Sequence, residues 1–382
     1  MESQSEKPVV AVFAGARSTE HEVSLLSAHN IVNAIDTNKY DVVVIGIDKQ
    51  GIWKLYDAAN FVDNPGDITK IKLSDQPISG RLAVTQSSHD FYDIENDGKV
   101  VCSPDITFPA LLGNYSEDGT MQGLLRIMDV PFTTADVVGS SVGMDKDISY
   151  RLLRDAGLNV APFITLRKGG DVPAFQSILE QLEADLIFVK PANAGSSVGV
   201  SRVTSEAEYL SALELAFRYD VKVLVQKGIV GREVEISVMG LLGQQKTSVV
   251  GEIIEHDPND FYSYANKYVI DNAVDLVAPA EMSDELYQKI SEAAKKTCEA
   301  LEIENFARVD FFVTPDETVY INEPNTMPGF TAISMFPRLW QTSGMTYPEI
   351  VDNLLHLAKE RHSYRIDPIV TDAKDIVEAH GE

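Results

Sequence analysis

The chain has only two cysteines, Cys102 and Cys298, among its 382 residues. They lie far apart in the sequence, so no disulfide framework or zinc-ligand spacing is visible, and we expect two buried thiols. No apolar run approaches the roughly 18 residues of a membrane-spanning helix. The first residues also lack the apolar core and cleavage site of a secretory signal. We therefore expect a reducing, cytoplasmic location and no membrane partner.

Positive charge is also scarce, with 32 Lys and Arg against 58 Asp and Glu and a net charge of −26. A nucleic-acid surface needs clustered Lys and Arg, so nucleic-acid binding is not expected. Phosphate ligands are not excluded, because a site needs only a few local cations and backbone N–H groups. The length predicts two or three domains with a large core.

Short apolar runs give the order of the expected elements. Residues 9–13 form a first strand, a glycine turn and a helix from about Val23 follow, and residues 41–47 form a second buried strand. This β-α-β pattern predicts a parallel sheet, and residues 100–102 and 106–112 are expected to continue it. We predict an N-terminal substrate domain, a central domain, a C-terminal domain with a metal site and a loosely held tail, with these boundaries: 1–135, 136–227, 228–364 and 365–382.

The stretch KPANAGSSVGV at residues 190–200 contains G-x-S-x-G, the pattern of a hydrolase nucleophile elbow with Ser197 as nucleophile. An elbow needs a helix directly after the serine. Here β-branched residues follow, and a helix is expected only near Ser205, so the loop is predicted to be the turn of a β-hairpin. Its backbone N–H groups suit phosphate oxygens, and Lys190 adds a charge. On the loop alone, a phosphate cover and an ordinary surface hairpin stay open.

A second hairpin is predicted from residues 308–313 and 319–325. If its loop has the two residues Asp316 and Glu317, Asp310 lies opposite Glu323 and Arg308 opposite Asn325, all on one face. Such oxygen donors favour Mg²⁺ or Mn²⁺ over zinc. Arg308 is placed to hold an oxygen anion. The alternative is a solvated polar face of an edge hairpin.

Several further motifs occur in a fixed order along nearly the whole chain. They are RSTEHEVS at 17–24, EDGTMQG at 117–123, GMDK at 143–146, the 190–199 loop, FYSYANKY at 261–268, RVD at 308–310 and NEPNTMPGFT at 322–331. Each is weak alone, but the ordered set resembles the ATP-grasp superfamily and, within it, the D-alanine–D-alanine ligases.

This resemblance implies an α/β chain with an N-terminal Rossmann-like (pre-ATP-grasp) parallel-sheet domain, followed by a two-part α+β ATP-grasp fold. It implies that ATP phosphorylates the carboxylate of one D-alanine and that the amine of a second attacks the acyl phosphate. The product would be the D-Ala-D-Ala dipeptide for peptidoglycan precursors. The expected cofactors are ATP, as co-substrate, and two Mg²⁺ or Mn²⁺ ions, and the expected assembly is a homodimer.

The resemblance also assigns roles to individual residues. Those implied to bind ATP are Lys146, Lys190, Ser196, Ser197, Gln226, Lys227, Ile229, Glu233, Lys267, Asn322 and Glu323. Those implied to hold the metal ions are Asp310, Glu323 and Asn325. Arg308 and the Gly329 N–H would stabilise the tetrahedral intermediate. Glu20 would bind the ammonium of the first substrate and Ser334 the carboxylate of the second, while Glu20, Ser196 and Tyr268 match a hydrogen-bonded trio.

This chain departs from the family pattern at three positions. Many members carry His where Leu112 stands, so a charge-stabilising contact is missing or comes from elsewhere, with Tyr115 as one source. Gln226 and Gly228 replace a usual Glu and a frequent aromatic residue near the adenine, so stacking at Gly228 is lost.

Several functions stay open at this point. Tyr268 favours an amine-bearing second substrate, but a D-alanine–D-serine ligase or another carboxylate–amine ligase of the superfamily is an alternative. A serine hydrolase using Ser197 lacks a convincing His partner. A non-enzymatic binding module is disfavoured by the metal face.

Overall fold

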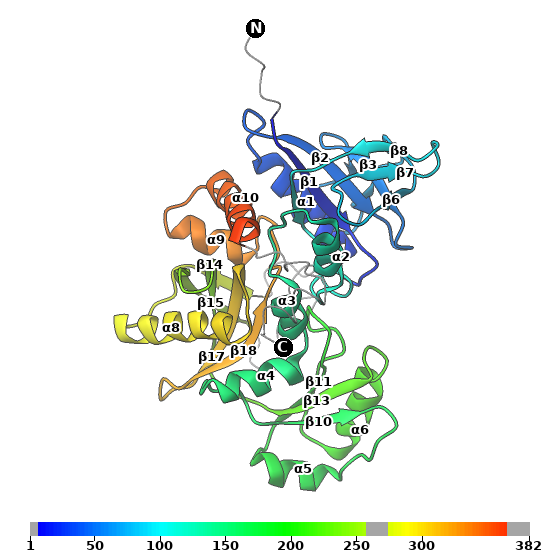
Figure 1. Ribbon diagram of the computed structural model, residues 1–382. Coiled ribbons are helices and arrows are strands. Elements are labelled where there is room, and N and C mark those ends of the chain that lie inside the picture. Colours follow the sequence, from blue (N-terminus) through cyan, green and yellow to red (C-terminus); the bar gives the residue numbers. More distant parts are fainter. Residues whose placement is uncertain (1–6, 257–273, 365–382) are drawn as a thin grey trace, which may run out of the picture.

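The computed structural model describes residues 7–256 and 274–364. These residues form three larger sheets, two smaller ones and the helices that cover them (Figure 1). None of the helices in these residues is long and apolar enough to cross a membrane. Cys102 and Cys298 are buried free thiols, as expected.

The N-terminal sheet, of which β1, β2 and β3 are blue in Figure 1, has the spatial order β3-β2-β1-β9. Its strands are β3 (Trp53–Asp57), β2 (Asp41–Ile47), β1 (Val9–Gly15) and β9 (Ile106–Pro109). β1 pairs in parallel with both β2 and β9, which confirms the predicted parallel sheet, and β3 adds an antiparallel edge. Gly15 ends β1 with φ +95°, and a Cβ there would lie 2.2 Å from the Ile47 carbonyl oxygen. Only glycine allows this turn, which leads into α1 (His21–Ala34).

The expectation that residues 100–102 continue this sheet is wrong. They belong to β8 (Lys99–Cys102), which pairs antiparallel with β7 (Phe91–Asp93) in a small separate sheet with β6 (Leu82–Val84). A second small sheet joins β4 (Val62–Asp63) to β5 (Lys72–Leu73). An apolar run indicates a strand but does not identify its partner. The apolar residues of the small sheet, among them Phe91 and Cys102, pack against β1 residues such as Phe13 instead of joining their strand to the parallel sheet.

Three helices lead from the N-terminal sheet to the rest of the chain: α2 (Thr120–Met128), α3 (Val137–Met144) and α4 (Lys146–Asp155). α3 lies at the centre of the molecule in Figure 1. The Asp145 carboxylate caps α4 by accepting hydrogen bonds from the backbone N–H groups of Asp147 and Ile148. This cap places Lys146 at the first position of α4.

The central sheet has the order β10-β13-β11-β12. Its strands are β10 (Phe163–Arg167), β13 (Lys222–Lys227), β11 (Ile187–Pro191) and β12 (Ser201–Val203). α5 (Phe175–Leu182) and α6 (Glu206–Ala216) share its apolar core. The capping box at Ser205 begins α6. β11 and β12 pair antiparallel on either side of the glycine-rich loop, so the predicted hairpin is confirmed.

The third sheet has the order β16-β15-β14-β17-β18. Its strands are β16 (Val274–Val277), β15 (Lys246–Glu255), β14 (Arg232–Gly240), β17 (Asn305–Val313) and β18 (Val319–Asn325). α8 (Asp284–Ala300) packs on the face that carries Val234, Ile236 and Val309. Since side chains alternate along a strand, the opposite face carries the polar residues of these strands. α9 (Met335–Thr342) and α10 (Tyr347–Tyr364) complete the chain that the structure describes.

The β17–β18 hairpin confirms one prediction and corrects another. Asp310 pairs with Glu323 and Arg308 with Asn325, as predicted. The two-residue loop is wrong, because beyond Asp310 the partners are Phe311 with Ile321, shifted by one position. A β-bulge at Asn322 absorbs the extra residue and restores the register at the carboxylates.

Candidate active site

Two adjoining cavities lie between the N-terminal, central and third sheets. The first has a volume of about 90 Å³ and the second about 550 Å³, and Lys146, Gly195 and Glu323 line both. Candidate residues lining only the first are Glu20, Ser196, Arg308, Asn325, Gly329 and Ser334. Those lining only the second are Lys190, Ser197, Gln226, Lys227, Ile229, Glu233, Asp310 and Asn322. The two cavities thus collect every candidate residue within the described part of the chain; Lys267 and Tyr268 lie outside it.

An ion pair marks the boundary between the two cavities. Lys146 Nζ lies 2.9 Å from Glu323 Oε2 and donates to the Ala194 carbonyl oxygen at 2.9 Å. Burial acts to lower the pKa of Lys146, but the attraction of Glu323 and of the Tyr150 oxygen outweighs it, so the pKa lies above the ordinary lysine value. Lys146 therefore keeps its charge at the point where both cavities meet.

Lys190 lies deeper, at the end of β11 in the second cavity. Its Nζ donates to the Tyr150 hydroxyl at 2.9 Å, and this hydroxyl donates to the Asn322 carbonyl oxygen at 2.6 Å. The acceptor carbonyl belongs to the residue that bulges from β18. Burial, followed by the positive charge of Lys146, lowers the pKa of Lys190 to about 7. Lys190 therefore responds to pH within the physiological range, and an anion beside it would favour its charged form.

The predicted metal residues present oxygen donors on one face of β17 and β18, yet they do not form an assembled cluster. Arg308 Nε and Nη2 donate to the two oxygens of Asp310 at 2.7 Å each, and Asn325 Nδ2 donates to the same carboxylate at 2.9 Å. Within residues 7–256 and 274–364, no group of three or more His, Cys, Asp and Glu is placed to hold a metal ion. The donor types fit Mg²⁺ or Mn²⁺, while Arg308 and Lys146 neutralise the two carboxylates.

Glu235 belongs to the site but was not among the residues predicted from the sequence. It lies on β14 opposite Asp310, is 3% exposed, and approaches Arg308 Nε with its Oε2 at 3.0 Å. The alternation of Glu233, Glu235 and Ser237 with apolar residues was the signal for this polar face. A single strand does not show whether such a face meets solvent or a cavity.

The glycine-rich loop connects the central sheet to the N-terminal unit. Ser196 and Ser197 have φ angles of +49° and +58°, and Ser196 Oγ donates a hydrogen bond to the Glu20 carboxylate. The predicted Glu20–Ser196 contact is therefore present, and its third member, Tyr268, stays a prediction. Ser197 precedes a strand, which is incompatible with a nucleophile elbow, and no histidine is among the described residues that line either cavity.

Ser334 and Gly329 form the far end of the first cavity. The Thr331 N–H donates to Ser334 Oγ at 2.9 Å, and the Thr331 and Ser334 hydroxyls lie 2.8 Å apart. Ser334 also precedes the first residue of α9, where helix N-termini favour anions. A carboxylate is thus a suitable ligand for this end.

The family comparisons agree with this geometry. The family model for the D-ala D-ala ligase N-terminus matches residues 9–135, and that for the D-ala D-ala ligase C-terminus matches residues 152–356. The chain belongs to the D-alanine–D-alanine ligase family.

Relatives and solved structures span almost the entire chain. D-alanine–D-alanine ligase A of Escherichia coli K12 is 46% identical over 359 residues, which are 94% of this chain and 97% of that protein. The structure of the D-alanine–D-alanine ligase from Coxiella burnetii has a TM-score of 0.78 at 32% identity, covering 98% of this chain and 99% of that one. VanG D-Ala:D-Ser ligase from Enterococcus faecalis also has a TM-score of 0.78 at 32% identity, covering 92% and 100%. These likenesses confirm the predicted ATP-grasp fold.

The first departure from the expected family pattern, Gly228, has a structural explanation. Gly228 donates its N–H to the Leu186 carbonyl oxygen at 2.8 Å, and a Cβ at Gly228 would lie 2.7 Å from Leu186 Cγ. Leu186 therefore fills the space that a side chain at 228 would need. Two aromatic residues that were not predicted from the sequence, Phe188 and Phe312, line the second cavity.

The second departure, Leu112, is buried and lines the first cavity of this family member. Tyr115, considered above as its substitute, is 54% exposed and is absent from the described lining of that cavity. Glu117 does line it and accepts hydrogen bonds from the N–H groups of Gly113 at 2.8 Å and Met327 at 3.3 Å. Burial, followed by repulsion from Glu20, raises the pKa of Glu117. Glu117 therefore connects the Leu112 segment to the segment that follows β18.

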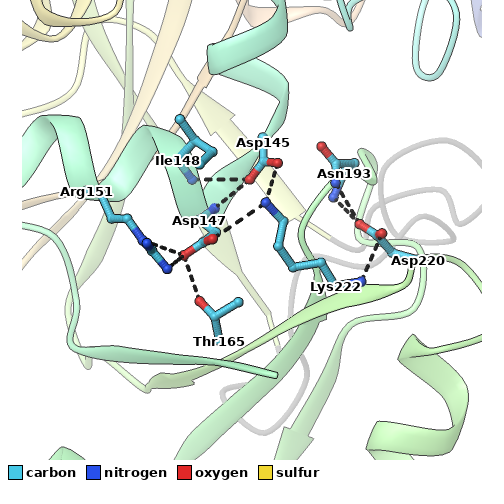
Figure 2. A network of polar contacts seen from close by, with 8 residues as sticks. All are labelled: Asp145, Asp147, Ile148, Arg151, Thr165, Asn193, Asp220 and Lys222. Carbon is cyan, nitrogen blue, oxygen red and sulfur yellow. Dashed lines mark hydrogen bonds and ion pairs between the residues drawn. The ribbon is translucent and has the colours of Figure 1, made fainter. Parts of the chain in front are cut away.

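A network of polar contacts lies between the glycine-rich loop and α4 (Figure 2). Lys222 forms ion pairs with Asp145, the cap of α4, and with Asp147 at 3.5 Å. Asp220 accepts hydrogen bonds from the backbone and side-chain nitrogens of Asn193, both at 2.8 Å. The network thus joins the start of α4, which carries Lys146, to the base of the glycine-rich loop at Asn193.

Proposed function

We propose that this chain is an ATP-dependent ligase that joins two D-alanines into the D-Ala-D-Ala dipeptide used for peptidoglycan precursors. The observation that carries the proposal is the Lys146–Glu323 pair at the boundary of the two cavities. The larger cavity has the volume of a small-molecule site and carries the predicted nucleotide residues. The smaller one carries the predicted amino-acid residues. A phosphoryl group can therefore meet a carboxylate at this boundary.

The proposed reaction has two steps. A carboxylate oxygen of the first D-alanine attacks the γ-phosphorus of ATP, and the bond from that phosphorus to the departing ADP oxygen breaks. The amine nitrogen of the second D-alanine then attacks the acyl carbon, the bond to phosphate breaks, and the nitrogen loses a proton. In such a reaction the protein contributes positioning and charge stabilisation.

The side chains have distinct parts in this proposal. Lys146 and Lys190 neutralise phosphate oxygens, with Lys267 as a third cation, and the loop with Ser196 and Ser197 covers them. Gln226, Lys227, Ile229 and Glu233 contact the nucleoside, together with Phe188 and Phe312. Asp310, Glu323 and Asn325 would hold two Mg²⁺ or Mn²⁺ ions, which supply positive charge to the phosphate oxygens when bound.

The amino acids occupy the first cavity. Glu20, held by Ser196, binds the ammonium of the first D-alanine, and Ser334 donates to the carboxylate of the second. Arg308 and the Gly329 N–H stabilise the negative charge that develops on the acyl oxygen. Tyr268 is the third member of the hydrogen-bonded trio with Glu20 and Ser196.

A D-alanine–D-serine ligase is the second candidate, because VanG matches the structure with the same TM-score as the Coxiella burnetii enzyme. Phosphate release from ATP and Mg²⁺ separates the two, with D-Ala, D-Ser, D-lactate and L-Ala offered singly and in pairs. We expect turnover with D-Ala alone, and the dipeptide is then identified by mass. Turnover that requires D-Ser would favour the second candidate, and no D-alanine-dependent turnover would overturn both.

The proposal also includes a cytoplasmic homodimer that acts on small molecules only. Sedimentation of the purified chain measures its mass directly, and a species at the monomer mass at micromolar concentration would contradict the dimer.

A further inference from the structure

Arg308 faces two acidic side chains at the boundary of the first cavity. Asp310 accepts from its Nε and Nη2, and Glu235 Oε2 lies 3.0 Å from the same Nε. The two carboxylates come from paired strands, since Glu235 on β14 lies directly opposite Asp310 on β17. Both are 3% exposed. One guanidinium thus meets two buried carboxylates.

Two carboxylates, with two negative charges, face the single positive charge of Arg308. Asp310 alone provides a bidentate partner, which is the strongest pairing for a guanidinium, and a second buried carboxylate adds repulsion as well as attraction. The second carboxylate is explained if Asp310 binds another cation once the ligands are bound. In the proposed function, on which this inference rests, Asp310 is a ligand of the metal ions.

We propose that Glu235 is a positioning residue, which holds Arg308 when Asp310 turns toward the metal. The Arg308 side chain is only 15% exposed, and the loss of a carboxylate partner at such a position is costly. Glu235 keeps hold of Nε, so Nη1 and Nη2 stay available to the acyl oxygen in the first cavity. Glu235 also lines the first cavity, but the role proposed for it is exercised through Arg308.

A double-mutant cycle tests this role in two measurements. Glu235→Gln removes the charge and retains the shape, and it should fold, because Asp310 still neutralises Arg308. We expect kcat to fall about 10- to 100-fold with little change in KM for ATP. Mn²⁺ titrated into the nucleotide-free protein should bind more weakly, because Arg308 then competes for Asp310. In an Arg308→Ala background, Glu235→Gln should change kcat and the Mn²⁺ dissociation constant less than about twofold.

Glu214→Gln, an exposed residue of α6 with the same charge change, is the matched control and should leave both quantities unchanged. Thermal unfolding of each variant confirms that it is folded. The proposal is overturned if Glu235→Gln changes kcat, or the Mn²⁺ dissociation constant, by the same factor in the wild-type and Arg308→Ala backgrounds. A wild-type kcat in Glu235→Gln also overturns it. If the wild-type chain shows no D-alanine-dependent turnover, the proposed function fails by itself, and the Mn²⁺ cycle still decides whether Glu235 acts through Arg308.

Discussion

Replacing Lys190 with methionine removes a buried charge from the nucleotide cavity, and the structure predicts that the resulting loss of ATP affinity depends strongly on pH. Burial and the nearby Lys146 lower the pKa of Lys190 to about 7 in the ligand-free protein. A bound phosphate favours the charged amine and raises this pKa. Binding therefore takes up a proton. The contribution of Lys190 to affinity is fully present well below pH 7. It declines as the pH rises above 7, and the decline ends when the pH exceeds the pKa of Lys190 in the complex.

The size of the effect follows from the fraction of free protein with a charged Lys190. With a pKa of about 7, this fraction is ~0.9 at pH 6, ~0.5 at pH 7, ~0.1 at pH 8 and ~0.01 at pH 9. The dissociation constant for the nucleotide should thus rise about tenfold from pH 6 to pH 8, and about tenfold more by pH 9. Proton uptake on binding should be ~0.5 per nucleotide at pH 7 and ~0.9 at pH 8.

Calorimetry with the non-hydrolysable analogue AMP-PNP, at fixed Mg²⁺ and in buffers of different ionisation enthalpy, measures both quantities. Lys190→Met serves as the reference, because the titration of the nucleotide itself is common to both proteins and cancels in the ratio of their dissociation constants. The dissociation constant of Lys190→Met divided by that of the wild type should be largest at pH 6, about tenfold smaller at pH 8 and about tenfold smaller again at pH 9. A ratio that stays the same from pH 6 to pH 9 would refute the reasoning.

Three further predictions concern the metal residues, the network of Figure 2 and the glycine-rich loop. Asp310→Asn should weaken Mn²⁺ binding and lower Mg²⁺-dependent turnover at least about tenfold; unchanged metal dependence in a phosphate-release assay would contradict the metal assignment. Lys222→Met leaves Asp145 and Asp147 without their shared lysine, and it should destabilise the protein by about 3 kcal/mol, seen as a lower urea midpoint with a higher KM for ATP. Ser197→Ala should raise KM for ATP and largely retain kcat, whereas abolished turnover would return Ser197 to the role of nucleophile.

The carboxylate hairpin shows how a correct prediction can rest on an incomplete reason. In the sequence, Asp310 lies opposite Glu323 if the loop of the hairpin has the two residues Asp316 and Glu317. The structure has a shifted loop and a compensating bulge at Asn322. Period-two alternation determined which face the carboxylates share, and this held in spite of the loop. The bulge could not be predicted from the local pattern of β18. At the bulge the Asn322 carbonyl accepts a hydrogen bond from the hydroxyl of Tyr150, which lies far away in the sequence.

Other parts of the molecule depend on packing that a single sequence does not reveal. The strands β3 to β8 are short, and their apolar residues do not distinguish an extension of the parallel sheet from a separate small sheet. The partner of Arg308 on β14, Glu235, was missed for a related reason. Its alternation with apolar residues predicts a strand with one polar face, but only the pairing of β14 with β17 brings that face to Asp310.

In the ligand-free site each predicted metal-binding carboxylate forms an ion pair with a cationic side chain, so ligand binding must break these pairs. Glu323 is paired with Lys146, and Asp310 with Arg308, so each predicted metal carboxylate is held by a cation that the proposal assigns to substrate. Phosphate oxygens would draw Lys146 away from Glu323, and the acyl oxygen would take the Nη atoms of Arg308 away from Asp310 while Glu235 keeps its Nε. Each departure leaves a carboxylate that needs a new cation. Nucleotide and metal should therefore bind cooperatively, because each removes a competitor for the partner of the other.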